Sequence, residues 1–343
     1  MVILLLAAPL YLSSFPLNLL GQFLALAILA LGLDLIWGYT GILSLGQGVF
    51  FGLGGYGMAM YLKLASLAPG EVPDFMTWSG MQDLPSLWKP FGHFYWTALL
   101  IVAVPGIVAV ILGNLVFRSR IRGVYFSILT QALAVVAATL FVNQQSLTGG
   151  SSGLTGFTQI LGFSLLKDRT QIGLYEASLL LLILAYAGVT WLVRSPVGQV
   201  LRAIRDGENR TRFCGYDPAA FKTLVFAVAA VLAAIAGALY VPQNGIIAPG
   251  MLGVVPSIEM VVWVAVGGRG TVLGAIVGTL FVNYAKYYLS NVWPNVWLYF
   301  LGTLFVLVVL VFPKGILGVV DQIRGLRRRS QSRSARDHGP ESA

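Results

Sequence analysis

Long runs of apolar residues recur along the chain and constrain its fold more than any other feature. A run of about 20 apolar residues matches the hydrocarbon thickness of a bilayer. Only 10% of the 343 residues are charged, whereas soluble domains carry roughly 25%. The sequence therefore predicts an all-α fold, a polytopic membrane helical bundle with broken helices. The expected segments, about ten in number, are 1–15, 18–37, 42–62, 95–117, 121–142, 174–193, 221–243, 256–266, 272–290 and 297–312.

Basic residues are distributed unevenly between the two sides of this layout. With both ends of the chain in the cytoplasm, all but five of the 22 basic residues lie on the inner side. Because cytoplasmic loops are enriched in Lys and Arg, this asymmetry predicts an N-in, C-in topology. It also explains the net charge of +9 without any nucleic-acid partner. The five basic residues expected outside are Lys63, Lys89, Lys167, Arg169 and Lys286.

The chain offers little for enzymatic chemistry. Its single cysteine, Cys214, excludes an internal disulfide and cysteine-rich metal sites. The two histidines, His93 and His338, fall in an outer loop and in the basic tail. No Gly-x-x-x-x-Gly-Lys-Ser/Thr phosphate loop occurs, so the sequence predicts no ATPase site of this kind. We expect a transmembrane domain over residues 1–320, no metal site and no bound cofactor. The tail over 321–343 is predicted to be disordered and to lie on anionic lipid.

The stretch from Gly38 to Tyr61 carries no charge but contains eight glycines. Glycine allows close helix packing and helix breaks inside a membrane protein. Thr40, Ser44 and Gln47 follow the spacing i, i+4 and i+7, so a helix would place them on one face. With Gly41, these residues are candidates for one wall of a pathway for a small neutral solute. The alternative is that their polar groups satisfy one another or the neighbouring backbone.

Further polar candidates lie at membrane depth elsewhere. Glu259 follows Pro256 in a segment of about eleven residues, which is too short to cross as a straight helix. That segment is expected to be partly inserted or to continue into its neighbour around a glycine break. Carboxylates at membrane depth are functional candidates by default, and Glu259 is expected to face an outer vestibule or to cap the short helix. Asn283 is a second pathway candidate, whereas Asp34 is expected to anchor a helix end near the inner face.

A short glycine pattern occurs twice. Gly38-x-x-Gly41-x-x-x-Leu45-Gly46 is echoed by Gly267-x-x-Gly270-x-x-Leu273-Gly274, with a spacing that differs by one residue. Duplicated halves around a central path are common among transporters. The echo is compatible with a duplication, and chance similarity is the alternative.

The inner loop between residues 195 and 218 alternates apolar and charged residues at helical spacing. Val197, Val200, Leu201 and Ile204 form its apolar stripe. Such an amphipathic helix either lies on lipid or docks in a groove of a cytosolic partner, and its acidic residues favour docking. The candidate docking residues of this loop are Gly198, Leu201, Arg202, Ile204, Arg205, Asp206, Glu208, Arg212 and Gly215.

Motifs over nearly the whole chain resemble those of the branched-chain amino acid/urea family of ABC-importer permeases. They are Gly38-Tyr-Thr-Gly-Ile-Leu-Ser-Leu-Gly-Gln47, Gly198-Gln-Val-Leu-Arg-Ala-Ile-Arg205, Ala236-Gly-Ala-Leu-Tyr240 and Phe312-Pro-Lys-Gly-Ile316. Within this family the chain most resembles the urea ABC-transporter permeases, through Asp74-Phe-Met76 and Ser257-Ile-Glu-Met-Val-Val-Trp-Val-Ala-Val-Gly-Gly-Arg-Gly-Thr271. It departs from that subgroup where Ser151-Ser152 and Gly156 replace two asparagines and an aspartate.

The resemblance implies a permease of the bacterial inner membrane that pairs with a second homologous permease subunit. Two cytosolic ATPase subunits, which use ATP, and an extracytoplasmic solute-binding protein would complete the importer. By family analogy the 198–218 loop is the coupling helix. The main hypothesis is urea import, and the nearest alternative is import of branched-chain or other small amino acids. A stand-alone facilitative channel or ion-coupled transporter is an alternative of another class, against which the docking loop argues.

Overall fold

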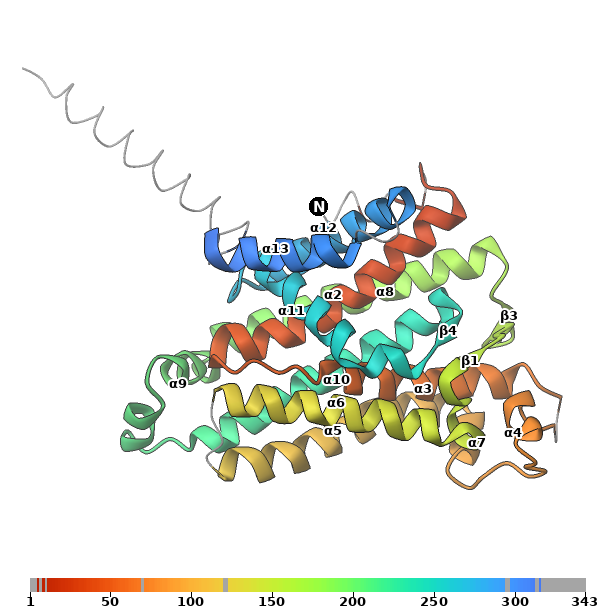
Figure 1. Cartoon of the computed structure of the whole chain (residues 1–343), viewed down its shortest axis with the longest axis horizontal. Coiled ribbons are helices and arrows are strands. Elements are labelled where there is room, and N and C mark those ends of the chain that lie inside the picture. The colour runs from red at the N-terminus through yellow and green to blue at the C-terminus, as the bar shows by residue number, and fades with distance from the viewer. Residues whose placement is uncertain are drawn as a thin grey trace, which may run out of the picture.

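The computed structural model describes residues 5, 8, 9, 11–68, 71–119, 123–293, 297–311 and 315. Long helices run side by side along the long axis of the molecule (Figure 1). The main helices of this part of the chain are α2 (Ser14–Thr40), α3 (Gln47–Ala65), α5 (Phe94–Arg118), α6 (Val124–Asn143), α8 (Asp168–Arg194), α10 (Pro218–Asn244), α11 (Val254–Gly267), α12 (Val272–Val292) and α13 (Trp297–Val311).

Shorter elements gather at the two ends of the bundle (Figure 1). The amphipathic helix α9 (Pro196–Phe213) lies at one end. The other end holds α4 (Asp74–Trp78), η1 (Lys89–Gly92), α7 (Gln145–Thr148), η2 (Gly150–Ser152) and two ribbons of two-residue strands. β1 (Leu154–Thr155) pairs with β4 (Ile246–Ile247), and β2 (Gln159–Ile160) pairs with β3 (Phe163–Ser164), both antiparallel. The 3₁₀ turn η3 (Pro249–Leu252) precedes α11.

Within the described residues, six helices are long and apolar enough to cross a membrane, namely α2, α5, α6, α8, α10 and α12. The prediction of a polytopic helical membrane protein is therefore confirmed. Helices also occupy the three other predicted segments between residues 42 and 312. The first predicted segment, 1–15, falls mostly outside the described residues, as does the tail 321–343. The count of ten crossings and the N-in, C-in orientation stay predictions.

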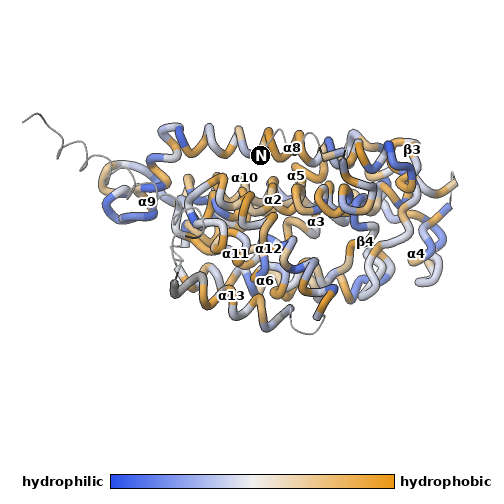
Figure 2. The backbone as a smooth tube through the Cα atoms, turned by 90° about the horizontal axis from the view of Figure 1, so that it is seen from above, coloured by the Kyte–Doolittle hydropathy of each residue, from blue (hydrophilic) through white to orange (hydrophobic). Residues whose placement is uncertain are grey.

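Helices α2 and α10 form the centre of the bundle. Most of the apolar window of α2 is buried, whereas only a minority of the corresponding windows of α5 and α6 is buried. Small residues bring the central backbones together: a Cβ on Gly32 of α2 would lie 3.0 Å from the Cα of Ala229 in α10. Figure 2 shows hydrophobic residues along the helices, with hydrophilic residues gathered near α9 at one end and near α4 and β3 at the other.

Two differences from the sequence-based expectation fall at glycines. α2 continues to Thr40 instead of ending before Gly38, and Gly41 terminates it with a φ of 79°. α11 does not continue through the glycine break, so that interpretation is wrong. Gly267 packs on Gly274 and Gly278, which requires α12 to run back antiparallel to α11. The turn between them uses Gly268 and Gly270 at positive φ.

Candidate functional site

Residues 41–46 form a non-helical segment inside the bundle, between α2 and α3. Backbone groups at membrane depth need partners within the protein, and α6 supplies them here. The Ser127 hydroxyl donates to the Leu43 carbonyl at 2.7 Å, and the Leu45 amide donates to the Thr130 hydroxyl at 3.0 Å. Neither hydroxyl residue stands out in the sequence, because Ser and Thr are ordinary constituents of membrane helices. The unwound segment is thus held in place by α6.

This break separates three candidate pathway residues. Thr40 ends α2, Ser44 lies in the unwound segment, and Gln47 begins α3. Their expected common helical face is wrong, because Gly41 terminates the helix between them. The Thr40 hydroxyl donates to the Ile36 carbonyl of its own helix at 2.6 Å. For Thr40, this bond fits the alternative of local backbone satisfaction.

Gln47 is only 1% exposed, yet neither polar atom of its side chain has a hydrogen-bond partner within the described part of the chain. The next residue, Gly48, packs against η3 and α11: a Cβ there would lie 3.0 Å from both the Leu252 carbonyl oxygen and the Ser257 hydroxyl. The N-terminal turns of α3 and α11 therefore meet inside the bundle. Leaving a buried amide without a hydrogen-bond partner costs free energy, so the Gln47 side chain favours binding of a polar group at this junction.

A cleft of about 390 Å³ lies close to this junction, between α2, α3, η3, α10, α11 and α12. A cavity of this size can hold a small organic molecule. Phe51, one turn after Gln47, contributes to the cleft from α3. Its other apolar walls include Phe23, Leu26, Tyr240 and Met260, and its polar lining is formed by Gln22, Glu259, Trp263, Asn283, Lys286, Ser290 and Asn291.

Glu259 of α11 and Lys286 of α12 form an ion pair in this cleft. The Lys286 ammonium donates to both carboxylate oxygens, at 2.7 and 2.9 Å, and the Trp297 indole N–H donates to one of them at 3.4 Å. Glu259 is 8% exposed, and a buried carboxylate needs such a partner. Its expected capping role is wrong. α11 begins at Val254, which places Glu259 in the second turn with its carboxylate bound by side chains.

Asn283 also lines the cleft, one turn before Lys286 on α12. Its amide donates to the Thr279 carbonyl at 2.9 Å, and its oxygen makes no hydrogen bond within the described part of the chain. From α11, the buried Trp263 indole N–H lacks an acceptor among the described residues. The cleft thus brings together two sequence-predicted candidates, Glu259 and Asn283. It adds Lys286 and Trp263, which sequence analysis did not select.

A polar junction joins α2 to the α11–α12 turn at the α9 end of the bundle. Asp34 accepts the Gly270 amide at 2.7 Å, and the Tyr39 hydroxyl donates to the Gly270 carbonyl at 3.0 Å. A Cβ on Gly38 would lie 2.6 Å from the Gly270 nitrogen, so close contact requires glycine there. Asp34 therefore anchors a helix end, as expected. The two similar glycine patterns pack on each other, and a duplication stays a hypothesis.

Arg269, in the same turn, was not singled out from the sequence. Its Nε donates to the Trp37 carbonyl at 3.1 Å, and its guanidinium lies 5.0 Å from the Trp37 ring centroid. Partial burial, followed by the nearby positive charge of Arg205, lowers the pKa of Arg269. This turn therefore carries positive charge against the end of α2.

The predicted amphipathic helix is α9, and it packs against α2, α8 and α10. Its buried stripe consists of Gly198, Leu201 and Ile204, whereas Val197 and Val200 are only half-buried. Gly198 must be small, because a Cβ there would collide with the Val193 carbonyl oxygen. The stripe holds α9 against the bundle and leaves its other face exposed.

The charged coupling candidates divide between the bundle and solvent. Arg205 donates to the Gly38 carbonyl at 2.8 Å and contacts exposed Asp206 at 3.1 Å. The Glu208 carboxylate forms an ion pair with the ammonium group of buried Lys222 of α10 at 2.8 Å, and it lies 3.7 Å from the Arg212 guanidinium. The remaining two candidates, Arg202 and Gly215, are exposed, and Gly215 has a φ of 89° just after the helix.

A groove of about 600 Å³ lies on the outer side of α9. The helix kinks at Gly207, where ψ is 80° instead of a helical value. The two halves of α9 and the start of α10 line the groove, with Val200, Ala203, Tyr216 and Phe221 as apolar contributors. Exposed apolar residues in a groove rimmed by charges are typical of a protein docking surface.

These features define a polytopic membrane protein with a broken helix, an internal polar cleft and an external amphipathic helix. A family model described as "Branched-chain amino acid transport system / permease component" matches residues 15–309, and the chain belongs to this family. It is 26% identical over 314 residues to the high-affinity branched-chain amino acid permease protein LivM of Escherichia coli K12, a match that covers 84% of this chain and 67% of LivM. No solved structure matches the chain.

Other relatives extend the same similarity. The chain is 25% identical over 308 residues to LivH of Salmonella typhimurium, covering 85% of this chain and 91% of LivH. It is 26% identical over 316 residues to a probable branched-chain amino acid permease protein LivM of Methanocaldococcus jannaschii, covering 84% and 89%. The predicted family, a transport component rather than an enzyme, and a multi-pass location in the inner membrane are confirmed. The urea assignment has no support in these similarities.

Proposed function

We propose that the chain is the translocation subunit of an ATP-driven importer for small amino acids. It binds no cofactor itself, and separate cytosolic ATPase subunits hydrolyse ATP. A second homologous permease and an extracytoplasmic binding protein complete the importer. The observation that carries this proposal is the groove of α9, because a helix tied to the bundle by Arg205 and grooved on its outer face suits docking of a partner.

The proposed orientation places α9 in the cytoplasm. Positive charge concentrates at its end of the bundle, which fits the positive-inside rule. The opposite end carries fewer basic residues and holds the short helices and strands that would face the binding protein. The basic residues at the α9 end include Arg118, Arg194, Arg202, Arg205, Arg210, Arg212, Lys222 and Arg269.

The cleft has the chemistry that an aliphatic amino acid needs. Glu259 suits an α-ammonium group, Lys286 suits an α-carboxylate, and apolar walls such as Phe23 suit an aliphatic side chain. Without substrate, Glu259 and Lys286 pair with each other. A bound amino-acid zwitterion would replace this one ion pair with two, in which Glu259 pairs with the α-ammonium group and Lys286 with the α-carboxylate. The Trp263 N–H adds a donor without a described acceptor.

Urea is the second candidate substrate. The resemblance of residues 74–76 and 257–271 to urea permeases favours it, and the amides and carboxylate of the cleft can exchange hydrogen bonds with a neutral solute. The names of the relatives favour amino acids. The amino-acid proposal therefore comes first.

The substrate test titrates the cognate binding protein with leucine and with urea, then measures uptake of each labelled solute by cells with and without this subunit. Amino-acid import predicts that leucine binds and that its uptake is lost on deletion. Urea binding with loss of urea uptake alone would favour the second candidate. Lys286→Gln should reduce leucine uptake more than urea uptake, because only leucine has a carboxylate to pair with.

The partner test uses the purified subunit in vesicles without ATPase subunits. An importer subunit gives no net uptake there, and uptake appears when ATPases, second permease, binding protein and ATP are added. Solute flux through the isolated subunit would instead support a stand-alone channel or ion-coupled transporter.

A further inference from the structure

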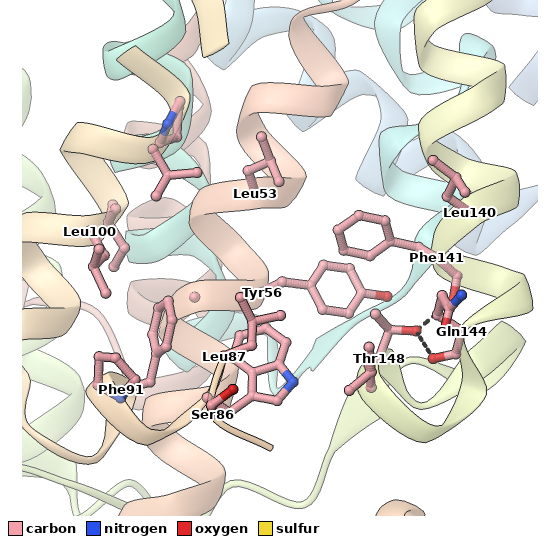
Figure 3. A pocket seen from close by; sticks show the side chains of 17 residues that line it. Leu53, Tyr56, Ser86, Leu87, Phe91, Leu100, Leu140, Phe141, Gln144 and Thr148 are labelled. Carbon is pink, nitrogen blue, oxygen red and sulfur yellow. Dashed lines mark hydrogen bonds between the residues drawn. The ribbon is translucent and has the colours of Figure 1, made fainter. Parts of the chain in front are cut away.

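A second large cavity, of about 640 Å³, shares no lining residue with the cleft. It is lined by residues of α3, η1, α5, α6 and α7 and of the adjoining loops (Figure 3). Leu53, Leu100, Val104, Leu140 and Phe141 give it an apolar wall. Its size falls in the range of roughly 300–1,000 Å³ that holds a small organic ligand.

This cavity opens toward the surface where lipid lies. α5 packs against α3 and α10, whereas α6 packs mainly against η3, η2 and α3, and the cavity lies between α5 and α6. The outer faces of both helices are apolar and exposed, with Val104 40% exposed and Leu140 55% exposed. Exposed apolar helices of membrane-spanning length face hydrocarbon. The ligand that the bilayer would supply to such an opening is an acyl chain.

Two buried polar groups in the lining point to a ligand that also carries an acceptor. The Tyr56 hydroxyl and the Trp88 indole N–H have no hydrogen-bond partner among the residues described, and the two side chains are 1% and 7% exposed. In Figure 3 the Tyr56 ring extends across the pocket toward Phe141. The neighbouring Thr148 hydroxyl is already bonded to the Phe141 and Gln144 carbonyls. Two unmet donors in an apolar cavity suit an ester or carboxyl oxygen.

The depth of the cavity agrees with this chemistry. α5 begins at Phe94, so Leu100 and Val104 lie roughly 9 and 15 Å along the helix from its start. Trp88 lies just before that start, and tryptophan is enriched at membrane interfaces because its indole is amphipathic. Trp88 is therefore nearer the interface than Leu100 and Val104 are, whereas Tyr56 extends into the cavity from the middle of α3.

We propose that this cavity binds one acyl chain of a membrane lipid, whose ester oxygen accepts hydrogen bonds from Tyr56 and Trp88. The acyl chain enters between α5 and α6, and the lipid headgroup remains at the membrane surface. A free fatty acid has the same chemistry at its carboxyl end and is the other possible source. This inference is independent of the transported solute.

The test compares the full-length protein with two matched variants, purified in mild detergent and analysed by native mass spectrometry. Val104→Trp fills the cavity, whereas Val102→Trp adds the same bulk to an exposed position of α5 outside the lining. The wild type and Val102→Trp should retain one added mass, and Val104→Trp should lose it. A phospholipid mass supports the diacyl source, and a fatty-acid mass assigns the site to free acids. Equal retention by both variants, or no retained mass in the wild type, would overturn the proposal.

Tyr56→Phe provides an independent measurement, which does not depend on Val104→Trp folding. Removing an unpaired buried hydroxyl should raise the melting temperature of the delipidated protein, and it should weaken lipid retention about fivefold, the effect of one hydrogen bond. Brominated-acyl phosphatidylglycerol should quench less tryptophan fluorescence in Trp88→Phe than in the wild type. A lower melting temperature with unchanged retention, or unchanged quenching, would contradict the assigned role of these donors.

Discussion

The Arg205 guanidinium of α9 donates a hydrogen bond of 2.8 Å to the Gly38 carbonyl, two residues before α2 ends. Gly38 itself packs against Gly270 in the turn between α11 and α12. One arginine therefore ties the external amphipathic helix to the point where two broken elements of the bundle meet. A displacement of α9 must either break this bond or move the end of α2, and this relationship gives the proposed coupling a physical route.

Arg205→Ala should lower ATP-driven uptake about tenfold, the scale of a typical coupling free energy, while the protein still folds. The physical reason is that α9 loses its hydrogen bond to the end of α2 but keeps its buried apolar stripe. Reconstituted uptake and ATPase rates check this. Arg194→Ala, an exposed arginine at the end of α8, is the control. Equal losses in both variants would mean that general charge, rather than this contact, matters.

Gly38→Ala should destabilise the protein by about 1–3 kcal/mol, the usual cost of overpacking. The added Cβ would lie 2.5 Å from the Asp34 carboxylate and 2.6 Å from the Gly270 nitrogen. Gly188→Ala in α8 meets nothing within 4 Å, and should leave the melting temperature unchanged or raise it slightly. Thermal unfolding in detergent compares the two, and an unaffected Gly38→Ala would show that the contact is loose.

Thr130→Val should destabilise the unwound segment by about 1–3 kcal/mol, because the Leu45 amide loses its buried acceptor. Thr130→Ser keeps the hydroxyl and should remain close to the wild type. Thermal stability and protease sensitivity between residues 41 and 46 measure the effect. If both variants behave alike, the hydroxyl does not hold the segment.

Glu259→Gln and Lys286→Met should each lower stability by about 1–3 kcal/mol, less than a fully buried pair because the Lys286 side chain is 39% exposed. The double variant should be more stable than the sum of the two losses predicts, since neither charge is left unpaired. A double-mutant cycle on melting temperature measures this coupling. Strict additivity would show that the pair contributes nothing as a pair.

Cys214 is exposed just after α9 and is the single cysteine of the chain, so it reports orientation directly. A membrane-impermeant maleimide should label it in inside-out vesicles and not in intact spheroplasts. In a Cys214→Ala background, Trp78→Cys places the thiol at an 85% exposed position of the opposite end, and the labelling pattern should invert. Labelling of Cys214 from outside would overturn the N-in, C-in orientation.

Much of the fold was accessible from the sequence because apolar runs of bilayer length allow few alternatives. The helices α5, α6, α8 and α10 begin and end within a few residues of the predicted segments, except for the earlier start of α8 at Asp168. The amphipathic helix was also predicted, since its apolar spacing and charges are local properties. Its buried face was only partly correct: Gly198 is buried and Val197 is not, because close approach of the α8 backbone favours glycine.

The candidate site was less predictable, because its members are distant in sequence. Thr40, Ser44 and Gln47 are close in the sequence, yet Gly41 ends α2 at a positive φ. The three side chains therefore do not share one helical face. Glu259 is a good candidate as a carboxylate at membrane depth, but for its partner Lys286 the sequence indicates only a place among the five basic residues on the outer side. Ser127 and Thr130 carried no signal, since their role depends on an unwound segment from another part of the chain.

A helical bundle in a membrane, with a charged amphipathic loop, follows from the length, charge and periodicity of the sequence, which are local properties that need no knowledge of tertiary packing. The transport family was suggested by the resemblance of short motifs, which is also independent of packing. Tertiary contacts were needed to show that α6 holds the non-helical residues 41–46, that Glu259 pairs with Lys286 and that Arg205 reaches Gly38. Each of these depends on long-range contacts, through which buried polar and backbone groups far apart in the sequence satisfy one another.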